Sequence, residues 1–114
     1  MEIEKLVVRE NTTARISMTL YSDDSAIDLS AINHVEMHLR DSRSKAYRFS
    51  SADGSPKVTI VTASSGIVGF DPATGDLLAD RSPYFGYWLV YPTVATKYSV
   101  PEENEFILEI RKEF

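Results

Sequence analysis

Apolar and polar residues alternate along much of the chain with a period of two, which is the pattern of a half-buried β-strand. The alternation is clearest over residues 14–21, where Ala14, Ile16, Met18 and Leu20 are separated by more polar side chains. Successive side chains of a strand point to opposite faces, so these four residues are predicted to share one buried face.

Residues 34–40 alternate in the same way. Val35, Met37 and Leu39 are predicted to point into a core. The polar residues between them are predicted to form the solvent-facing side of the strand: His34, Glu36, His38 and Arg40.

Several shorter runs are rich in β-branched or aromatic residues and are bounded by turn residues, which is typical of strands. They cover residues 6–8, 47–49, 57–62, 67–70, 86–91 and 105–110. The 57–62 and 67–70 runs are close enough to form a hairpin. Residues 27–33 are predicted to be a loop with buried apolar side chains. A short helix is expected only within 71–80, capped by Asp71.

The run at 86–91 is the most apolar and aromatic in the chain and contains its only tryptophan, Trp88. Alternation places Trp88 and Val90 on one face, and Tyr87, Leu89 and Tyr91 on the other. A strand with two such faces is usually covered on both sides, so we predict that it is the central strand and that its second face needs a cover.

About seven strands at short spacing predict an all-β fold, an immunoglobulin-like β-sandwich of two antiparallel sheets with at most one short helical turn. A small barrel is the alternative architecture. The 114 residues, taken as 1–114, fit a single domain.

Composition excludes several classes of function. The absence of cysteine excludes disulfides and Cys-based zinc sites. A net charge of −5 with scattered basic residues disfavours nucleic-acid binding. No apolar run approaches the roughly 20 residues of a membrane helix, and the N-terminus does not resemble a signal peptide. We therefore expect neither a nucleic acid nor a membrane as partner, and synthesis in a cytoplasm.

The sequence contains only weak signals for catalytic or metal-binding residues. On a strand, His34 and His38 would lie about 13 Å apart, too far to share a metal directly, and two exposed strand residues are the favoured interpretation. Asp23, Asp24 and Asp28 lack an EF-hand spacing, as do the three aspartates of 71–80, so solvated turns are favoured. No nucleophile elbow or phosphate-binding glycine loop is present. The expectation is a protein that is not an enzyme and uses no cofactor or metal.

The remaining aromatic residues allow three interpretations: packing in the core, a sugar-binding surface, or a protein interface. They are Tyr84, Phe85, Tyr87, Tyr91 and Tyr98.

Three segments resemble the small immunoglobulin-like proteins of tailed bacteriophages, and in particular the N-terminal domain of phage baseplate upper proteins. Residues 27–41, from Ile-Asp-Leu-Ser-Ala to Leu-Arg-Asp, are similar to an Asp-Leu-Thr-Gly-Ala entry into a strand that ends in Arg-Asp. Residues 66–72 with 84–92 resemble a strand, an Asp-Pro, an acidic helical turn and a Gly-x-Tyr-x-x-x-Trp-x-Val segment. Residues 106–110 resemble the closing strand. The likeness covers about residues 3–111.

This resemblance implies a non-enzymatic structural or assembly subunit of a tailed-phage virion. Baseplate upper proteins continue into a fibre-like part, whereas this chain ends, so the expectation is a stand-alone tail, baseplate, neck or capsid-decorating component located in the virion. Its partners would be other virion proteins and copies of itself. The resemblance assigns Tyr84, Gly86, Trp88 and Val90 to the core. With Tyr98, the residues of the opposite face form the expected interface: Phe85, Tyr87, Leu89 and Tyr91. A carbohydrate-binding module for host recognition is the alternative.

Overall fold

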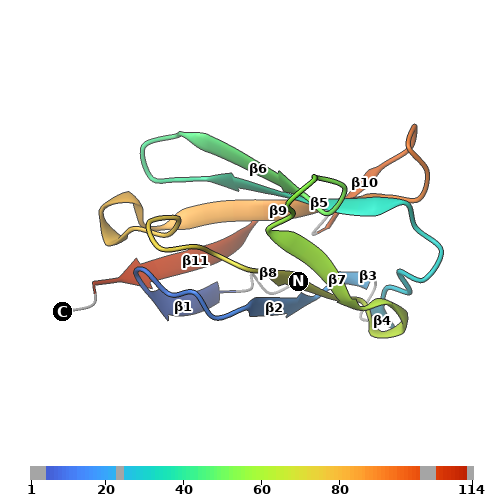
Figure 1. The fold of residues 1–114 in the computed structure, drawn as a ribbon, viewed down its shortest axis with the longest axis horizontal. Coiled ribbons are helices and arrows are strands. Elements are labelled where there is room, and N and C mark those ends of the chain that lie inside the picture. The colour runs from blue at the N-terminus through green and yellow to red at the C-terminus, as the bar shows by residue number, and fades with distance from the viewer. Residues whose placement is uncertain (1–4, 23–24, 101–104, 113–114) are drawn as a thin grey trace.

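A computed structural model describes residues 5–22, 25–100 and 105–112, and these form an all-β, sandwich-like fold of packed sheets (Figure 1). The larger sheet has the strand order β1-β11-β9-β5-β6, with β10 also paired to β9. Its strands are β1 (Lys5–Arg9), β5 (His34–Arg40), β6 (Ala46–Ser50), β9 (Tyr84–Tyr91), β10 (Tyr98–Val100) and β11 (Phe106–Arg111).

The smaller sheet has three strands in the order β2-β8-β7, and a separate two-stranded hairpin lies beside it (Figure 1). These strands are β2 (Ile16–Thr19), β7 (Val58–Thr62) and β8 (Ile67–Phe70), with β3 (Tyr21–Ser22) and β4 (Ser25–Ala26) in the hairpin. Within the described residues no strand pairing joins the two larger sheets, so the alternative of a closed barrel is wrong.

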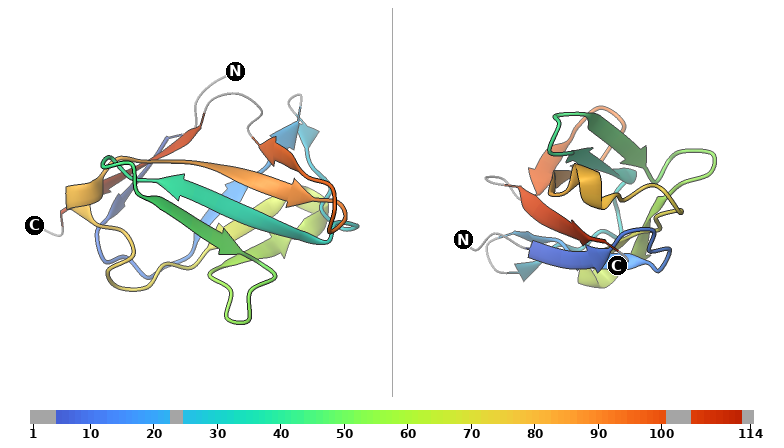
Figure 2. Two further views of the ribbon diagram at one scale, coloured as in Figure 1. Left: turned by 90° about the horizontal axis from the view of Figure 1, so that it is seen from above. Right: turned by 90° about the vertical axis from the view of Figure 1, so that its left-hand side faces the viewer.

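Strand β9 is central, as predicted, but it begins at Tyr84 rather than Gly86. It pairs with β5 over seven residue positions, and the two strands lie side by side along the length of the sheet (Figure 2). Its other edge is shared by β11 and β10. Strands β5, β10 and β11 therefore all form backbone ladders with β9.

The core lies between the two sheets and is joined across them by large side chains. Trp88 is 1% exposed, and its indole Nε1 donates a hydrogen bond of 3.3 Å to Met18 Sδ on the smaller sheet. The rings of Phe49 and Phe70, also from opposite sheets, have centroids 5.2 Å apart. The alternation predicted over 14–21 is confirmed for Ile16, Met18 and Leu20, which are buried in this core. It is wrong for Ala14, which is exposed and precedes the first residue of β2.

Gly86 marks the tightest packing along β9. A Cβ atom at this position would come within 2.5 Å of Phe106 Cζ, 2.7 Å of Leu39 Cδ2 and 2.8 Å of the His38 carbonyl oxygen. The strand reaches this close to its neighbours on both sides only because residue 86 has no side chain.

Two predictions about sheet and strand number need correction. The sheets are not purely antiparallel, because β1 pairs in parallel with β11, from Lys5 opposite Ile107 to Arg9 opposite Arg111. The described residues also contain eleven strand segments, more than the seven or so expected. The additional segments are short ones, β3, β4 and β10, whose two or three residues are too few to show a period.

The predicted helix within 71–80 is wrong. Asp71 does not cap a helix; its carboxylate forms a two-point ion pair with Arg15, at 2.7 and 3.0 Å. The segment is a loop that ends in a single 3₁₀ turn, η2 (Ala79–Arg81). A second 3₁₀ turn, η1 (Ala63–Ser65), connects β7 to β8. There are thus two short helical turns in the described residues instead of at most one.

The loop predicted over 27–33 is confirmed, with Leu29 only 2% exposed. Asp28 accepts a hydrogen bond from the Ser30 amide at 2.9 Å, which orders this loop locally. Asp23 and Asp24, the other members of the acidic group, lie outside the described residues.

Candidate functional site

Strand β9 separates two aromatic faces, and the structure confirms how the sequence divides them. Tyr84, Gly86, Trp88 and Val90 point into the core and are buried. The alternate residues are half-buried on the opposite side of the larger sheet, which we call the outer face: Phe85, Tyr87, Leu89 and Tyr91.

The outer face is built from stacks between β9 and β5. Residues that lie opposite each other on antiparallel strands share a face and contact one another. His34 lies opposite Tyr91, and their rings stack with centroids 4.2 Å apart and planes 13° from parallel. His38 lies opposite Tyr87, with a separation of 5.2 Å and an angle of 11°.

A third pair continues the same row. Arg40 lies opposite Phe85, and its guanidinium carbon sits 5.1 Å from the centre of the phenyl ring. The same guanidinium donates to the Glu105 carboxylate at 3.1 Å. Each aromatic side chain of β9 on this face therefore has a nitrogen-bearing partner on β5.

Glu36 lies between the two histidines, opposite Leu89, and is only 5% exposed. Its carboxylate accepts hydrogen bonds from Arg48 at 2.6 and 3.3 Å and from His38 at 3.1 Å. His34 Nε2 is 3.6 Å from the second carboxylate oxygen. The Glu36 carboxylate thus contacts the side chains of His34, His38 and Arg48.

The pKa of Glu36 reflects these contacts. Burial would raise it, but the hydrogen bonds from Arg48 and His38, together with the charges of both, hold the pKa below its ordinary value of 4.5. The carboxylate therefore remains ionised at neutral pH and acts as a fixed acceptor.

The predicted solvent-facing side of residues 34–40 is therefore wrong in part. The side chains of His34 and His38 are 14% and 27% exposed instead of extending into solvent, because each lies flat against a tyrosine ring. Strand β5 belongs to the same sheet as β9, so its side chains flank the aromatic residues of β9 without covering this face, and the predicted cover stays a prediction.

Tyr98 does not join the other four predicted interface residues. It lies opposite Val90 in the ladder of β10 and β9, so it projects from the core side of the sheet. Tyr98 is 41% exposed at the edge of the sheet. The outer face is thus formed without it, and Ser99 is the β10 residue opposite Leu89.

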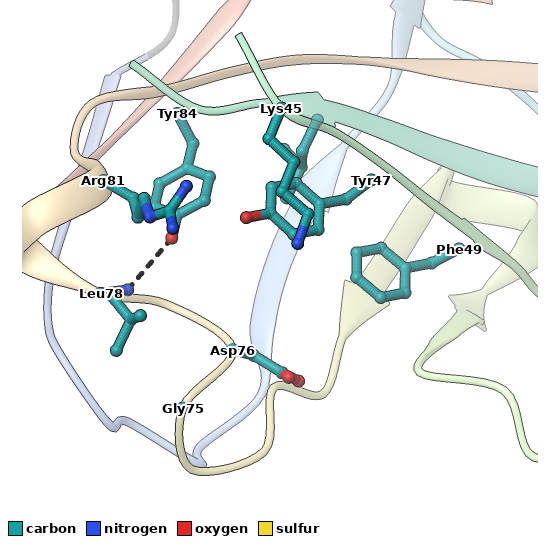
Figure 3. Close-up of a pocket in the computed structure, with 9 residues that line it drawn as sticks. Lys45, Tyr47, Phe49, Gly75, Asp76, Leu78, Arg81 and Tyr84 are labelled. Atoms are coloured by element: carbon teal, nitrogen blue, oxygen red, sulfur yellow. Dashed lines mark hydrogen bonds between the residues drawn. The ribbon is translucent and has the colours of Figure 1, made fainter. Parts of the chain in front are cut away.

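A pocket of about 210 Å3 lies elsewhere, between β6 and the loop of residues 71–83 (Figure 3). Tyr47 and Phe49 line it from β6, and Tyr84 lines it from β9. Asp76, Leu78 and Arg81 line it from the loop. None of these residues forms a recognisable sequence motif, because they come from segments that only the fold brings together.

Asp41 supports one end of this pocket and is fully buried. Its carboxylate accepts hydrogen bonds from Tyr47 Oη at 3.0 Å, from Arg81 at 3.3 Å, and from the amides of Arg43 and Lys45, each at 2.9 Å. Burial would raise the pKa of Asp41, but these hydrogen bonds and the Arg81 charge keep it below its ordinary value. Burial, and then the bond to Asp41, raises the pKa of Tyr47.

The candidate metal ligands do not converge. Among the described residues, no group of three His, Cys, Asp or Glu side chains is placed to hold a metal ion. Asp71 pairs with Arg15, and Asp76 pairs with Lys57 at 2.6 Å. None of the helical turns within the described residues is long and apolar enough to cross a membrane.

In comparisons with known proteins, no family model, curated protein or solved structure matches the chain. The proposed function therefore rests on the sequence and on the geometry described above.

Proposed function

We propose that the chain is a non-enzymatic structural subunit that assembles with other proteins through the outer face of its larger sheet. The observation that carries this proposal is the row of stacked pairs, Tyr91 on His34, Tyr87 on His38 and Phe85 under Arg40. Tyrosine, phenylalanine and arginine are enriched in protein interfaces and are frequent among the residues that dominate binding energy.

The order of these side chains also favours binding. Glu36 and the ring stacks already hold them in one arrangement. An interface residue that is fixed before binding loses little conformational entropy when a partner covers it. A sheet face whose side chains are already held in place is therefore well suited to a repeated contact in a larger assembly.

We further propose that the sandwich is of immunoglobulin type and that the assembly is the virion of a tailed phage, in its tail, baseplate, neck or capsid decoration. The chain passes from the larger sheet (β1) to the smaller (β2), back to β5 and β6, again to β7 and β8, and returns in β9 to β11. This alternation between two sheets supports a Greek-key sandwich. Partners would be other virion proteins and further copies of the chain.

The alternative of a carbohydrate-binding module expects a row of aromatic rings open to solvent. The aromatic set proposed for it does not form such a row: Tyr84 is buried, Tyr98 projects from the other face, and Tyr87 and Tyr91 stack on histidines. The outer face is therefore assigned to protein contacts.

Replacing Tyr87 by serine tests the assignment. Tyr87→Ser removes the ring that stacks on His38 but leaves the core intact, so the domain should fold while association weakens by about tenfold or more. Light scattering on a size-exclusion column measures the association of the chain with itself, and electron microscopy shows any ring or lattice. Mass spectrometry of phage particles from a host that carries the gene tests its presence in the virion.

Tyr21→Ser is the matched control, because Tyr21 is 56% exposed on the β3–β4 hairpin, away from the outer face. It should leave association unchanged. A folded Tyr87→Ser variant that associates as the wild type does would exclude the outer face as the interface. A chain that stays monomeric over the whole concentration range would exclude association with itself.

A further inference from the structure

The pocket beside β6 has a wall that is unusually well fixed for a loop (Figure 3). The Gly75 amide donates to Asn11 Oδ1 at 3.1 Å, and the Leu78 amide donates to Tyr84 Oη at 3.1 Å. The Ala79 amide donates to Glu10 Oε2 at 3.1 Å. Residues of the β1–β2 connection and of β9 thus hold the loop in place.

Charge is not balanced around this pocket. Arg81 is paired with Asp41, and Asp76 is paired with Lys57. Lys45, at the rim, has no carboxylate partner among the described residues; its ammonium lies 5.3 Å from the centre of the Tyr47 ring. A contact of this kind at an exposed site is weak, so an anion can draw the ammonium away. The positive charge of Lys45 therefore favours a negatively charged ligand.

The two walls differ in chemistry. The β6 wall presents the rings of Tyr47 and Phe49, whereas the loop wall presents the Asp76 carboxylate and the Arg81 guanidinium (Figure 3). The Asp76 Oδ2 atom accepts from Lys57 Nζ and from the Ala73 amide, and no described residue donates to its Oδ1 atom. A ligand that fits must have an apolar face, hydroxyl groups that can donate, and an acidic group.

Size limits the ligand further. A pocket of about 210 Å3 is smaller than the roughly 300–1,000 Å3 of sites that hold drug-sized molecules. We propose that the pocket binds a single hexuronic acid unit, such as occurs in acidic polysaccharides. The C–H face of the sugar ring packs on Tyr47 and Phe49, its carboxylate contacts Lys45, and its hydroxyl groups donate to Asp76. This site is separate from the outer face and does not depend on the proposed assembly role.

The test is an NMR titration of the complete 15N-labelled chain with glucuronate, with glucose as the neutral counterpart. Glucuronate should bind with a millimolar dissociation constant and shift the amides of residues 45–49 and 74–81. Glucose lacks the carboxylate that contacts Lys45, so it should bind about tenfold more weakly or worse. Lys45→Gln should weaken glucuronate binding by a similar factor and leave the rest of the spectrum unchanged.

Lys97→Gln is the control, because Lys97 is an exposed lysine in the turn between β9 and β10. It should bind glucuronate as the wild type does. The proposal is overturned by equal affinity for glucose, by unchanged affinity in Lys45→Gln, or by the absence of shifts. It is also overturned if acetate shifts the same amides with the same affinity, since the sugar ring would then contribute nothing.

Discussion

The two faces of β9 use the same kinds of residue under different constraints. On the core side, Trp88 and Tyr84 are each 1% exposed and are held by close packing from two sheets. On the outer face, Tyr87 and Tyr91 are held by stacking on histidines of a single neighbouring strand. In the core, a side chain is held because its neighbours fill the space around it, and shortening it leaves a cavity. On the surface, a ring is held by stacking on one partner, and that partner can be replaced without leaving a cavity.

The difference between the faces suggests a division of tasks. The free energy of folding depends mainly on the core side, because burial of large apolar side chains is the dominant favourable contribution. The outer face contributes less to folding, and in the assembly proposed above it would determine which partner can bind. Four substitutions along β9 and β5 test this division.

Trp88→Ala should have the largest effect. Removing a large buried aromatic side chain typically costs about 3–5 kcal/mol, which is a large part of the stability of a small domain. Leu89→Ala, at the adjacent position on the outer face, should cost only about 1 kcal/mol, because that side chain is half-buried. Urea denaturation of both variants measures the difference. Similar losses would contradict the division between the faces.

Glu36→Gln should have an intermediate effect that depends on pH. A carboxylate with a depressed pKa stabilises the folded state above its unfolded pKa, and this contribution is lost as the pH falls through the folded value. At pH 7 we expect Glu36→Gln to lower the free energy of unfolding by about 1 kcal/mol. The effect is no larger because solvent screens the charge of the exposed Arg48 side chain.

Thermal unfolding between about pH 7 and pH 3 measures this dependence. The wild type and Glu36→Gln should differ at neutral pH and converge in acid. Asp41, Asp71 and Glu109 also have depressed pKa values, so both proteins should lose stability in acid, and only the difference between them reports on Glu36. A constant difference at every pH would show that the charge of Glu36 is not what matters.

Tyr91→Phe should have the smallest effect. It removes a hydroxyl group that donates to Glu36 at 3.4 Å, a long hydrogen bond, and it keeps the ring that stacks on His34. The expected loss is below about 0.5 kcal/mol. Denaturation by urea, compared with the wild type, provides the check. A loss as large as that of Leu89→Ala would mean that the hydroxyl group, and not the stack, orders this part of the face.

Much of the fold could be predicted from alternation, since the pattern of β9, β5 and β2 is set by which side chains must avoid water. Ile16, Met18, Val35 and Leu39 are all buried where the period of two places them. The parallel pairing of β1 with β11 could not be predicted, because the direction of pairing between the two ends of a chain leaves no local pattern.

The candidate sites depend on information that a single strand does not carry. Alternation places Tyr87 and Tyr91 on the outer face, but only the register with β5 shows that they stack on His38 and His34. The loop of 71–83 departs from its expected helix because its backbone and side chains bond to distant residues, as Asp71 does to Arg15. The pocket depends on the same distant contacts, so it could not be found from the sequence.

The way in which β9 divides one of its edges between β11 and β10 affects how the domain opens. Residues 84–86 pair with β11, residues 88–90 pair with β10, and β5 spans the other edge. Withdrawal of β9 would break the ladders of three strands at once, so its amide protons should exchange with solvent only when the whole domain unfolds. By contrast, β10 has three residues and pairs with β9 alone among the described strands, so it can detach and return without disturbing them. The domain thus combines a slowly exchanging centre with an edge that opens more readily.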